Sequence, residues 1–348
     1  KQSVIKLDST SVSVDSFELR NQNQLFYANG LLSKRPDDKM IFGFENIDLS
    51  TANVLTERFN MLLNGTLSGQ ASINDPYNSF MMLADLSLDN FQLNDEILGS
   101  GIIQATWDNF NKKIDLKTEL IKGTTKTFYV EGDYYPKKSD IEFDLSFDKI
   151  KLTALNPYLD NFLTDIKGLG SGEFQIEGTT DKPEVSGKLS LFKSSFIVNY
   201  LQTRYYTTNS IKLENNNILF EDLEIFDEKG NSAIANGSVT TDYFKNMYLD
   251  LRLATNNFQF MNTTEKDNDM FFGNIHAGGT IRLNGAADNL NLNISATTKR
   301  NSIFYIPLYG SEEVMESDFI VFKESDNMDI DEKEQKKYEV DLRGQIGR

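Results

Sequence analysis

Two series of glycines with one shared spacing constrain the fold of this sequence more than any other feature. The first series is Gly30, Gly132 and Gly237, and the second is Gly65, Gly168 and Gly273. Successive members of each series lie roughly 105 residues apart, which is the signature of an internal repeat. We expect three copies, at residues 1–98, 99–204 and 205–310, and the start of a fourth at 311–348 with an acidic loop.

Apolar and polar residues alternate along much of the chain. The clearest apolar sets are Ile141, Phe143, Leu145 and Phe147; Met247, Leu249, Leu251 and Leu253; and Ile281, Leu283, Leu290, Leu292 and Ile294. A period of two is typical of β-strands, and it sends the apolar set to one face of a sheet. After Phe147 the apolar parity shifts to Ile150, which predicts a bulge or a bend.

A sheet with this many strands cannot stay flat, so it twists and curls about its apolar face. The sequence therefore predicts an all-β fold, an elongated and curled β-sheet groove whose repeats are joined by short connector helices. Helical spacing predicts the connectors, as amphipathic helices of two to three turns that serve as structural plugs. Their apolar residues are Leu55, Phe59 and Leu62 in the first copy and Leu155, Leu159 and Phe162 in the second.

Composition excludes several classes of function. The 35 basic residues face 52 acidic ones, a net charge of -17, which disfavours nucleic acids and anionic membrane surfaces as partners. The chain has no cysteine and a single histidine, so we expect no metal site, no cofactor and no enzymatic activity. No Gly-x-Ser-x-Gly motif accompanies His276, which we interpret as a surface or turn residue.

Two further patterns are weak. Asp326, Asp329 and Asp331 lack the glycine and glutamate spacing of a calcium loop, so a solvated loop is the better interpretation. The pairs Tyr134–Tyr135 and Tyr205–Tyr206 could form a sugar platform, although tyrosines on strand edges more often keep their hydroxyls in water. Lys1 stands in place of an initiator Met, so we expect the chain to be a piece of a longer protein.

A family resemblance covers nearly the whole chain. The succession from Asn216 to Val239, the segment Gly278–Gly285 and the run Thr297–Ser302 followed by Ile306–Leu308 resemble the repeat units of the TamB and AsmA-like family, of the Bacteroidetes type. The resemblance implies a periplasmic protein of Gram-negative-type bacteria that is anchored in the inner membrane by an N-terminal helix. It also implies phospholipids and an Omp85-type outer-membrane barrel, TamA or a BamA-like relative, as partners.

On this basis the expected function is a periplasmic conduit. Its apolar groove would shield phospholipid acyl chains between the inner and outer membranes and so support outer-membrane biogenesis. Two alternatives stay open. One is a scaffold or chaperone for outer-membrane protein assembly, which pairs its open edge with other strands by β-augmentation and works with the Omp85-type barrel. The other is a carbohydrate-binding β-protein.

Overall fold

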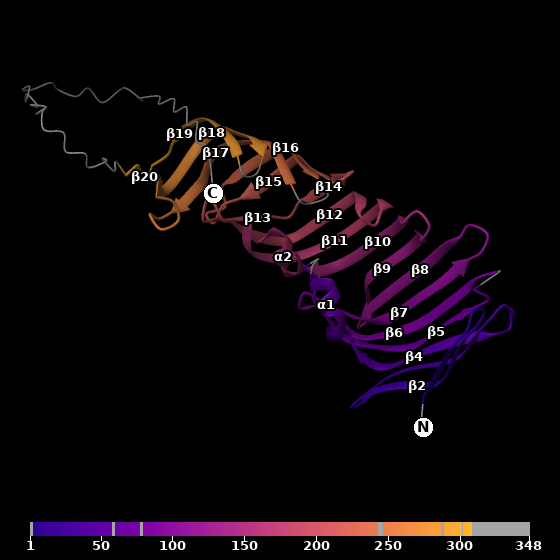
Figure 1. Cartoon of the computed structure of the whole chain (residues 1–348). Helices are drawn as coiled ribbons and strands as arrows, with labels where there is room; N and C mark the ends of the chain where they lie inside the picture. Colours follow the sequence, from indigo (N-terminus) through magenta and orange to yellow (C-terminus); the bar gives the residue numbers. More distant parts are fainter. Residues whose placement is uncertain are drawn as a thin grey trace, which may run out of the picture.

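The described residues form one curved antiparallel sheet of 20 strands (Figure 1). The computed structural model describes residues 3–57, 60–76, 79–242, 246–269, 271–286, 289–300 and 302–307. Figure 1 shows an elongated molecule in which the strands follow one another from the indigo to the yellow end, with the short helices on one long side. The predicted all-β, elongated and curled sheet is confirmed.

The strands follow in chain order. Their bounds are β1 (Val4–Leu7), β2 (Val12–Asn21), β3 (Gln24–Leu32), β4 (Lys39–Asp48), β5 (Leu63–Asn74), β6 (Met81–Leu93), β7 (Glu96–Asp108), β8 (Lys113–Lys122), β9 (Thr125–Tyr135), β10 (Asp140–Lys151), β11 (Leu163–Thr179), β12 (Lys182–Val198), β13 (Thr203–Thr207), β14 (Ser210–Glu214), β15 (Asn217–Phe226), β16 (Ser232–Asp242), β17 (Asn246–Thr263), β18 (Phe272–Ala286), β19 (Asn289–Thr298) and β20 (Ile303–Tyr305).

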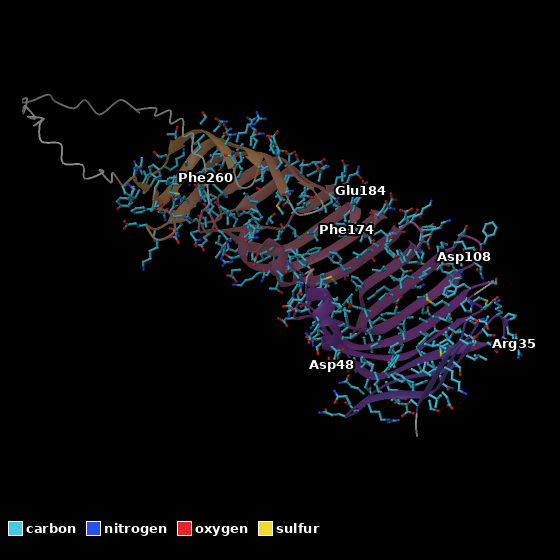
Figure 2. The ribbon with its side chains drawn as sticks, viewed as in Figure 1. Arg35, Asp48, Asp108, Phe174, Glu184 and Phe260 are labelled. Carbon is cyan, nitrogen blue, oxygen red and sulfur yellow. The ribbon has the colours of Figure 1, made fainter. Side chains whose placement is uncertain are left out.

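The topology is a meander, because nearly every strand pairs with its neighbours in the sequence. The local exceptions are β12, which pairs with both β13 and β14, and β18, which pairs with both β19 and β20. Turns therefore alternate between two long rims of the sheet. We call the rim that carries the helices the connector rim, and the opposite one the distal rim. In Figure 2, Arg35, Asp108 and Glu184 mark the distal rim, and Asp48 lies on the connector side.

β-Bulges bend the strands close to the connector rim. In β10, Phe147 lies opposite Gly172 of β11 and Ile150 opposite Gly170, so the register shifts where the sequence predicted it. Lys149, inside this bulge, has a φ of 50°. The same shift occurs at Phe44/Ile47 in β4, Leu88/Phe91 in β6 and Phe220/Leu223 in β15. It also occurs at Val14/Phe17 in β2, where it lies nearer the distal rim. Each bulge keeps apolar residues on one face while the strand turns.

A side chain on the next strand satisfies the extra amide of each of these bulges. The Lys149 N–H donates to Ser171 Oγ at 3.0 Å, and the Asp222 N–H donates to Asn236 Oδ1 at 2.9 Å. The other pairs are Ser16 with Asn29, Asn46 with Ser68 and Asn90 with Ser100. A glycine follows every acceptor: Gly30, Gly69, Gly101, Gly172 and Gly237. We call this arrangement, a bulge amide that donates to the side chain before a glycine, the bulge latch. It accounts for Gly30 and Gly237 of the first glycine series. It also accounts for the Ser-Gly pair that ends both segments of the second series, 65–69 and 168–172.

Replacing Ser171 by alanine should lower the free energy of unfolding by about 1–2 kcal/mol, because the bulge amide of Lys149 loses its acceptor. Ser171 Oγ also donates to Asp148 Oδ1 at 2.7 Å, so two hydrogen bonds disappear. Urea denaturation measures the change. Ser146→Ala, in the neighbouring β10, should stay within about 0.5 kcal/mol of the parent protein. Equal losses in the two variants would contradict the latch.

The predicted short connector helices are confirmed, but the apolar stripe predicted for them lies only partly within them. The first connector is a 3₁₀ turn (η1, Leu49–Ala52) followed by one α-turn (α1, Asn53–Thr56), and the second repeats this with η3 (Leu152–Leu155) and α2 (Asn156–Leu159). Of the predicted stripe, Leu55, Leu155 and Leu159 are helical, whereas Leu62 and Phe162 follow the helices. Phe59 lies outside the described residues. None of the described helices is long and apolar enough to cross a membrane.

The connectors are short because the chain must be extended again at the next strand. The Asn53 side chain bonds both the N–H and the C=O of Leu63, which in turn pairs with Leu93 of β6. Leu163 likewise pairs with Val198 of β12. Between β17 and β18 the described residues contain turns in place of a helix.

The buried core is divided into three small clusters, which lie at the bulges and toward the connector rim. Their buried members are Leu88, Leu98 and Leu120; Leu152, Ile166 and Leu191; and Tyr205, Leu223, Ile225, Ala233, Ala235 and Phe258. Leu49 and Leu159 of the connectors pack against the first two clusters. The core therefore stabilises the side of the sheet next to the connector rim. Among the described residues, the parts of the strands that extend toward the distal rim carry no equivalent cluster.

Candidate functional site

Cross-strand pairing joins apolar residues into one continuous row along the sheet. Leu145 of β10, for example, lies opposite Val130 of β9 and Phe174 of β11. The whole row, from β2 to β18, is Leu19, Phe26, Phe44, Gly69, Leu86, Ile103, Thr118, Val130, Leu145, Phe174, Gly187, Leu213, Ile218, Val239, Leu249 and Gly285. We call it the central row. Thr118 is its one polar member, and the row spans roughly 70 Å along the curve of the sheet.

In the described part of the chain, no second layer covers the face that carries the central row. Each strand packs against its neighbours in the sheet, and each connector packs against the strand that follows it. The remaining contacts between elements are small and lie across a bend. Leu145, Phe174 and Leu249 are half-buried, although nothing in the described part of the chain covers them. Because curling brings side chains together on the concave face, half-burial without a cover places the row on that face. The adjacent Asp144 and Glu173 point to the other face and are exposed.

The structure brings the three predicted apolar sets onto this one surface. Ile141, Phe143, Leu145 and Phe147 lie opposite Tyr134, Gly132, Val130 and Phe128, and all four are half-buried. Met247, Leu249, Leu251 and Leu253 are half-buried as well, opposite Thr241, Val239, Gly237 and Ala235. Ile281 is buried, and Leu283 and Ile294 are half-buried. The side chains of Leu290 and Leu292 lie outside what the structure describes.

Sequence reasoning missed every member of the row except Leu145 and Leu249. Phe44, Leu86 and Phe174 are examples. The sequence does contain a signal for these three residues, because apolar and polar residues alternate along each of their strands. A glycine or a bulge interrupts the alternation, which then continues on the other side. Only the register between strands shows that these residues adjoin the predicted sets.

The opposite face of the sheet is acidic. Glu142 of β10 lies between Asp133 of β9 and Glu177 of β11, and Asp144 lies opposite Glu131. Like charges directly opposite each other destabilise a sheet, so their presence indicates a face that stays in water. The described residues contain no group of acids and histidines that could hold a metal ion. Asp326, Asp329 and Asp331, the weak calcium-loop pattern, lie outside the described residues.

His276 corrects the prediction of a surface or turn residue. It lies within β18 and is 5% exposed, with Nε2 at 3.1 Å from Lys229 Nζ. Burial lowers the pKa of the ring, and the charge of Lys229 lowers it further. The Ser302 hydroxyl donates to the backbone oxygen of His276 and not to the ring. The described contacts of His276 therefore do not form a Ser-His-Asp arrangement.

Tyr205 corrects the expectation that the paired tyrosines keep wet hydroxyls. Its side chain is 3% exposed, and its hydroxyl donates to the backbone oxygen of Gln259 at 3.1 Å. Its ring stacks on Phe258 with the centroids 5.1 Å apart. Tyr206, by contrast, is 40% exposed. The pair therefore belongs partly to the core, and it presents one ring instead of a platform of two.

Comparison with protein families matches residues 221–346 to the TamB C-terminal domain. Over these residues the chain is similar to the TamB family. The TamB domain begins within β15, includes β16 to β20 and extends past the described residues. The central row enters it at Val239 and runs on without a break into the strands that precede it. No curated protein and no solved structure matches the chain.

TamB domains have a general role in the cell envelope. TamB domains are transport or assembly modules of the cell envelope and not enzymes. They are involved in outer-membrane assembly or in lipid transport, and they work with components of the outer-membrane assembly machinery.

Proposed function

We propose that this chain is part of a periplasmic conduit that shields phospholipid acyl chains between the inner and outer membranes. The observation that carries the proposal is the central row, an apolar surface that is continuous over sixteen strands and covered by no other layer of the described residues. The match of residues 221–346 to the TamB C-terminal domain supports it, since TamB domains take part in outer-membrane assembly or lipid transport.

The energetics favour such a surface for moving lipids. About thirty methylenes of a phospholipid cost roughly 24 kcal/mol when exposed to water, at ~0.8 kcal/mol each. An uninterrupted apolar wall removes most of this cost without specific contacts. Because the side chains are chemically similar at every step, the free-energy minima for a bound lipid are shallow. A lipid can therefore pass from one strand to the next. The single hydroxyl in the row, that of Thr118, would bind a passing lipid only weakly by comparison with a charged group.

The proposal includes a location and partners. An anchor in the inner membrane would hold one end of the protein, and an Omp85-type barrel, TamA or a BamA-like relative, would receive the other. The acidic outer face keeps such a rod soluble and discourages lateral adsorption to anionic membranes. The predicted repeats at 1–98, 99–204, 205–310 and 311–348 stay part of this proposal, as segments of one conduit.

Lipid extraction and mass spectrometry of the purified chain test the proposal. The parent protein should carry phospholipid. Leu249→Asp should remove most of it, because a carboxylate then interrupts the central row, and the fold should persist because Leu249 is only half-buried. Tyr248→Asp is the matched control, since Tyr248 is the adjacent residue on the opposite face and is 48% exposed. Absence of phospholipid from the parent protein would overturn the proposal, as would equal loss in the two variants.

One observation favours the scaffold alternative. Within the described residues β1 pairs with β2 alone, and its Ile5 and Leu7 are 55% and 75% exposed. An apolar edge strand of this kind can accept another strand by β-augmentation. Binding of a peptide from an outer-membrane barrel strand, lost on substitution of Ile5 by proline but not of Leu249 by aspartate, would favour this alternative over the conduit.

A further inference from the structure

The concave face changes chemically along each strand toward the distal rim. In β7 the inward residues run from Ile103 through Ala105 to Trp107, and the turn that follows ends at Lys112. In β9 they run from Val130 through Gly132 to Tyr134, ahead of Lys137 in the next turn. The order is aliphatic, then aromatic, then basic. A bilayer leaflet has the same order, from acyl chains through the interface to the headgroups.

The aromatic level is built around the single tryptophan of the chain. Trp107 lies at the end of β7, and its Nε1–H donates to Asn109 Oδ1 in the turn at 3.2 Å. Phe80, from the neighbouring turn, packs on it edge to face with the centroids 5.1 Å apart. Phe110, in the same turn as Asn109, is 92% exposed. Aromatic rings with a polar tip are most favourable where apolar and wet surroundings meet, so this level marks such a boundary.

The basic level consists of three turns on the distal rim, those that follow β3, β7 and β9. Each contains two adjacent basic residues: Lys34–Arg35, Lys112–Lys113 and Lys137–Lys138. Counted together with the strand residues that flank it, each turn has one more base than acids. The residues are Lys34, Arg35 and Lys39 against Asp37 and Asp38, Lys112 and Lys113 against Asp108, and Lys137 and Lys138 against Asp140. On a chain with a net charge of -17 the turns that follow β3 and β9 are local positive sites that complement an anion.

Several of these cations are not engaged by the protein itself. Lys113 is held between Asp115 and Asp133, at 2.8 and 2.7 Å, and these hydrogen bonds raise its pKa. In the described part of the chain, by contrast, Arg35, Lys137 and Lys138 are exposed and enter no ion pair. Figure 2 shows Arg35 at the outer edge of the sheet, with Asp108 farther along the same rim.

The width of the apolar wall fits one lipid leaflet. From Phe147 to Ile141 the concave face of β10 is apolar, a rise of roughly 20 Å along the strand. Half the hydrocarbon thickness of a bilayer is about 15 Å. Acyl chains that lie along the strands would therefore be covered over their whole length and would place the attached phosphate at the distal rim.

We propose that the distal rim binds the phosphate of phospholipids through the dibasic turns that follow β3 and β9, while the acyl chains lie parallel to the strands on the concave face. The proposal rests on the proposed conduit function and adds an orientation and a headgroup preference to it. A lipid would travel with its chains across the central row and its phosphate passing from turn to turn. A diacylglycerol, which has the same chains but no phosphate, would bind to the wall alone.

Binding of two lipids with the same labelled acyl chains, phosphatidylglycerol and diacylglycerol, tests this orientation. The variant Arg35→Gln/Lys137→Gln/Lys138→Gln removes three cations without breaking an ion pair of the described residues. The matched control, Lys188→Gln/Arg252→Gln/Lys299→Gln, removes the same charge from exposed positions elsewhere. The parent protein and the control should prefer phosphatidylglycerol by about fivefold or more, and the rim variant should lose that preference with diacylglycerol binding unchanged. Raising the salt concentration should weaken the preference as well.

The outcomes separate the two proposals. If neither lipid binds to the parent protein, the conduit function fails. If both lipids bind equally well, or the rim variant keeps the preference, the conduit survives and the headgroup assignment is overturned. Inorganic phosphate, added as a competitor at the concentration of the labelled lipid, should leave the preference intact. Loss of the preference in its presence would assign the turns to the free anion and overturn the headgroup assignment too.

Discussion

Replacing Phe258 by alanine should lower the free energy of unfolding by about 3–5 kcal/mol, the cost of emptying a closed aromatic site in a core. The Phe258 side chain is 0% exposed. Its ring stacks on Tyr205, with the centroids 5.1 Å apart, and meets Phe260 edge to face at 5.4 Å. The neighbouring strands are tied together by the Tyr205 hydroxyl, so they cannot easily collapse into the cavity. Urea denaturation followed by fluorescence and circular dichroism measures the loss.

Phe192→Ala is the matched control for this cavity. Phe192 lies in β12 and is 44% exposed, so its truncation removes little buried surface and should cost no more than about 1 kcal/mol. Comparable losses at Phe258 and Phe192 would mean that the region around Tyr205 is not a closed core. The two variants thus compare a closed core position with an exposed one. Truncating a half-buried residue of the concave face should cost an intermediate amount of free energy.

Gly237→Ala should cost about 3–4 kcal/mol, because strain and a clash act together. Gly237 has a φ of 128°, a conformation that residues with a side chain rarely adopt. A Cβ atom added there would lie 2.0 Å from the backbone oxygen of Asp250 in β17, and a backbone atom within a paired strand cannot move away cheaply. The same residue follows Asn236, whose side chain accepts the bulge amide of Asp222.

Gly230→Ala is the control that separates strain from clash. Gly230 has a φ of 79°, yet a Cβ atom added there would meet nothing within 4 Å. Its replacement should cost about 1 kcal/mol, from backbone strain alone. Thermal or urea unfolding of the two variants gives the comparison directly. If Gly237→Ala is no more destabilising than Gly230→Ala, the close approach of β16 and β17 at this point does not limit the fold.

Local patterns predicted the parts of this fold that depend on neighbours in the sequence. Alternation identified the strands and the concave residues around Phe143 and Leu249, and the broken parity after Phe147 located a bulge. The glycine series was recognised from its spacing, but its physical reason needed the structure. Gly30 and Gly237 follow the side chains that accept bulge amides, and that pairing involves residues on two strands.

Features that depend on distant residues could not be predicted. The connector at Leu55 and Leu62 has the same apolar spacing whether it forms one helix or a helical turn followed by a strand, and the hydrogen bonds from Asn53 to Leu63 decide between them. Tyr205 and His276 carry no local signal of burial. Tyr205 is buried because β17 brings Phe258 against it. The continuity of the central row depends on registers across many strands, which alternation within one strand does not specify.

The meander gives this protein an adjustable length. Since nearly every strand bonds to the strands just before and after it in the chain, inserting or deleting a hairpin leaves the remaining pairs unchanged. Each added pair of strands lengthens the sheet by about 10 Å and returns the chain to the rim from which it started. Evolution can therefore fit such a molecule to compartments of different width by duplicating hairpins, without redesigning any part that already works.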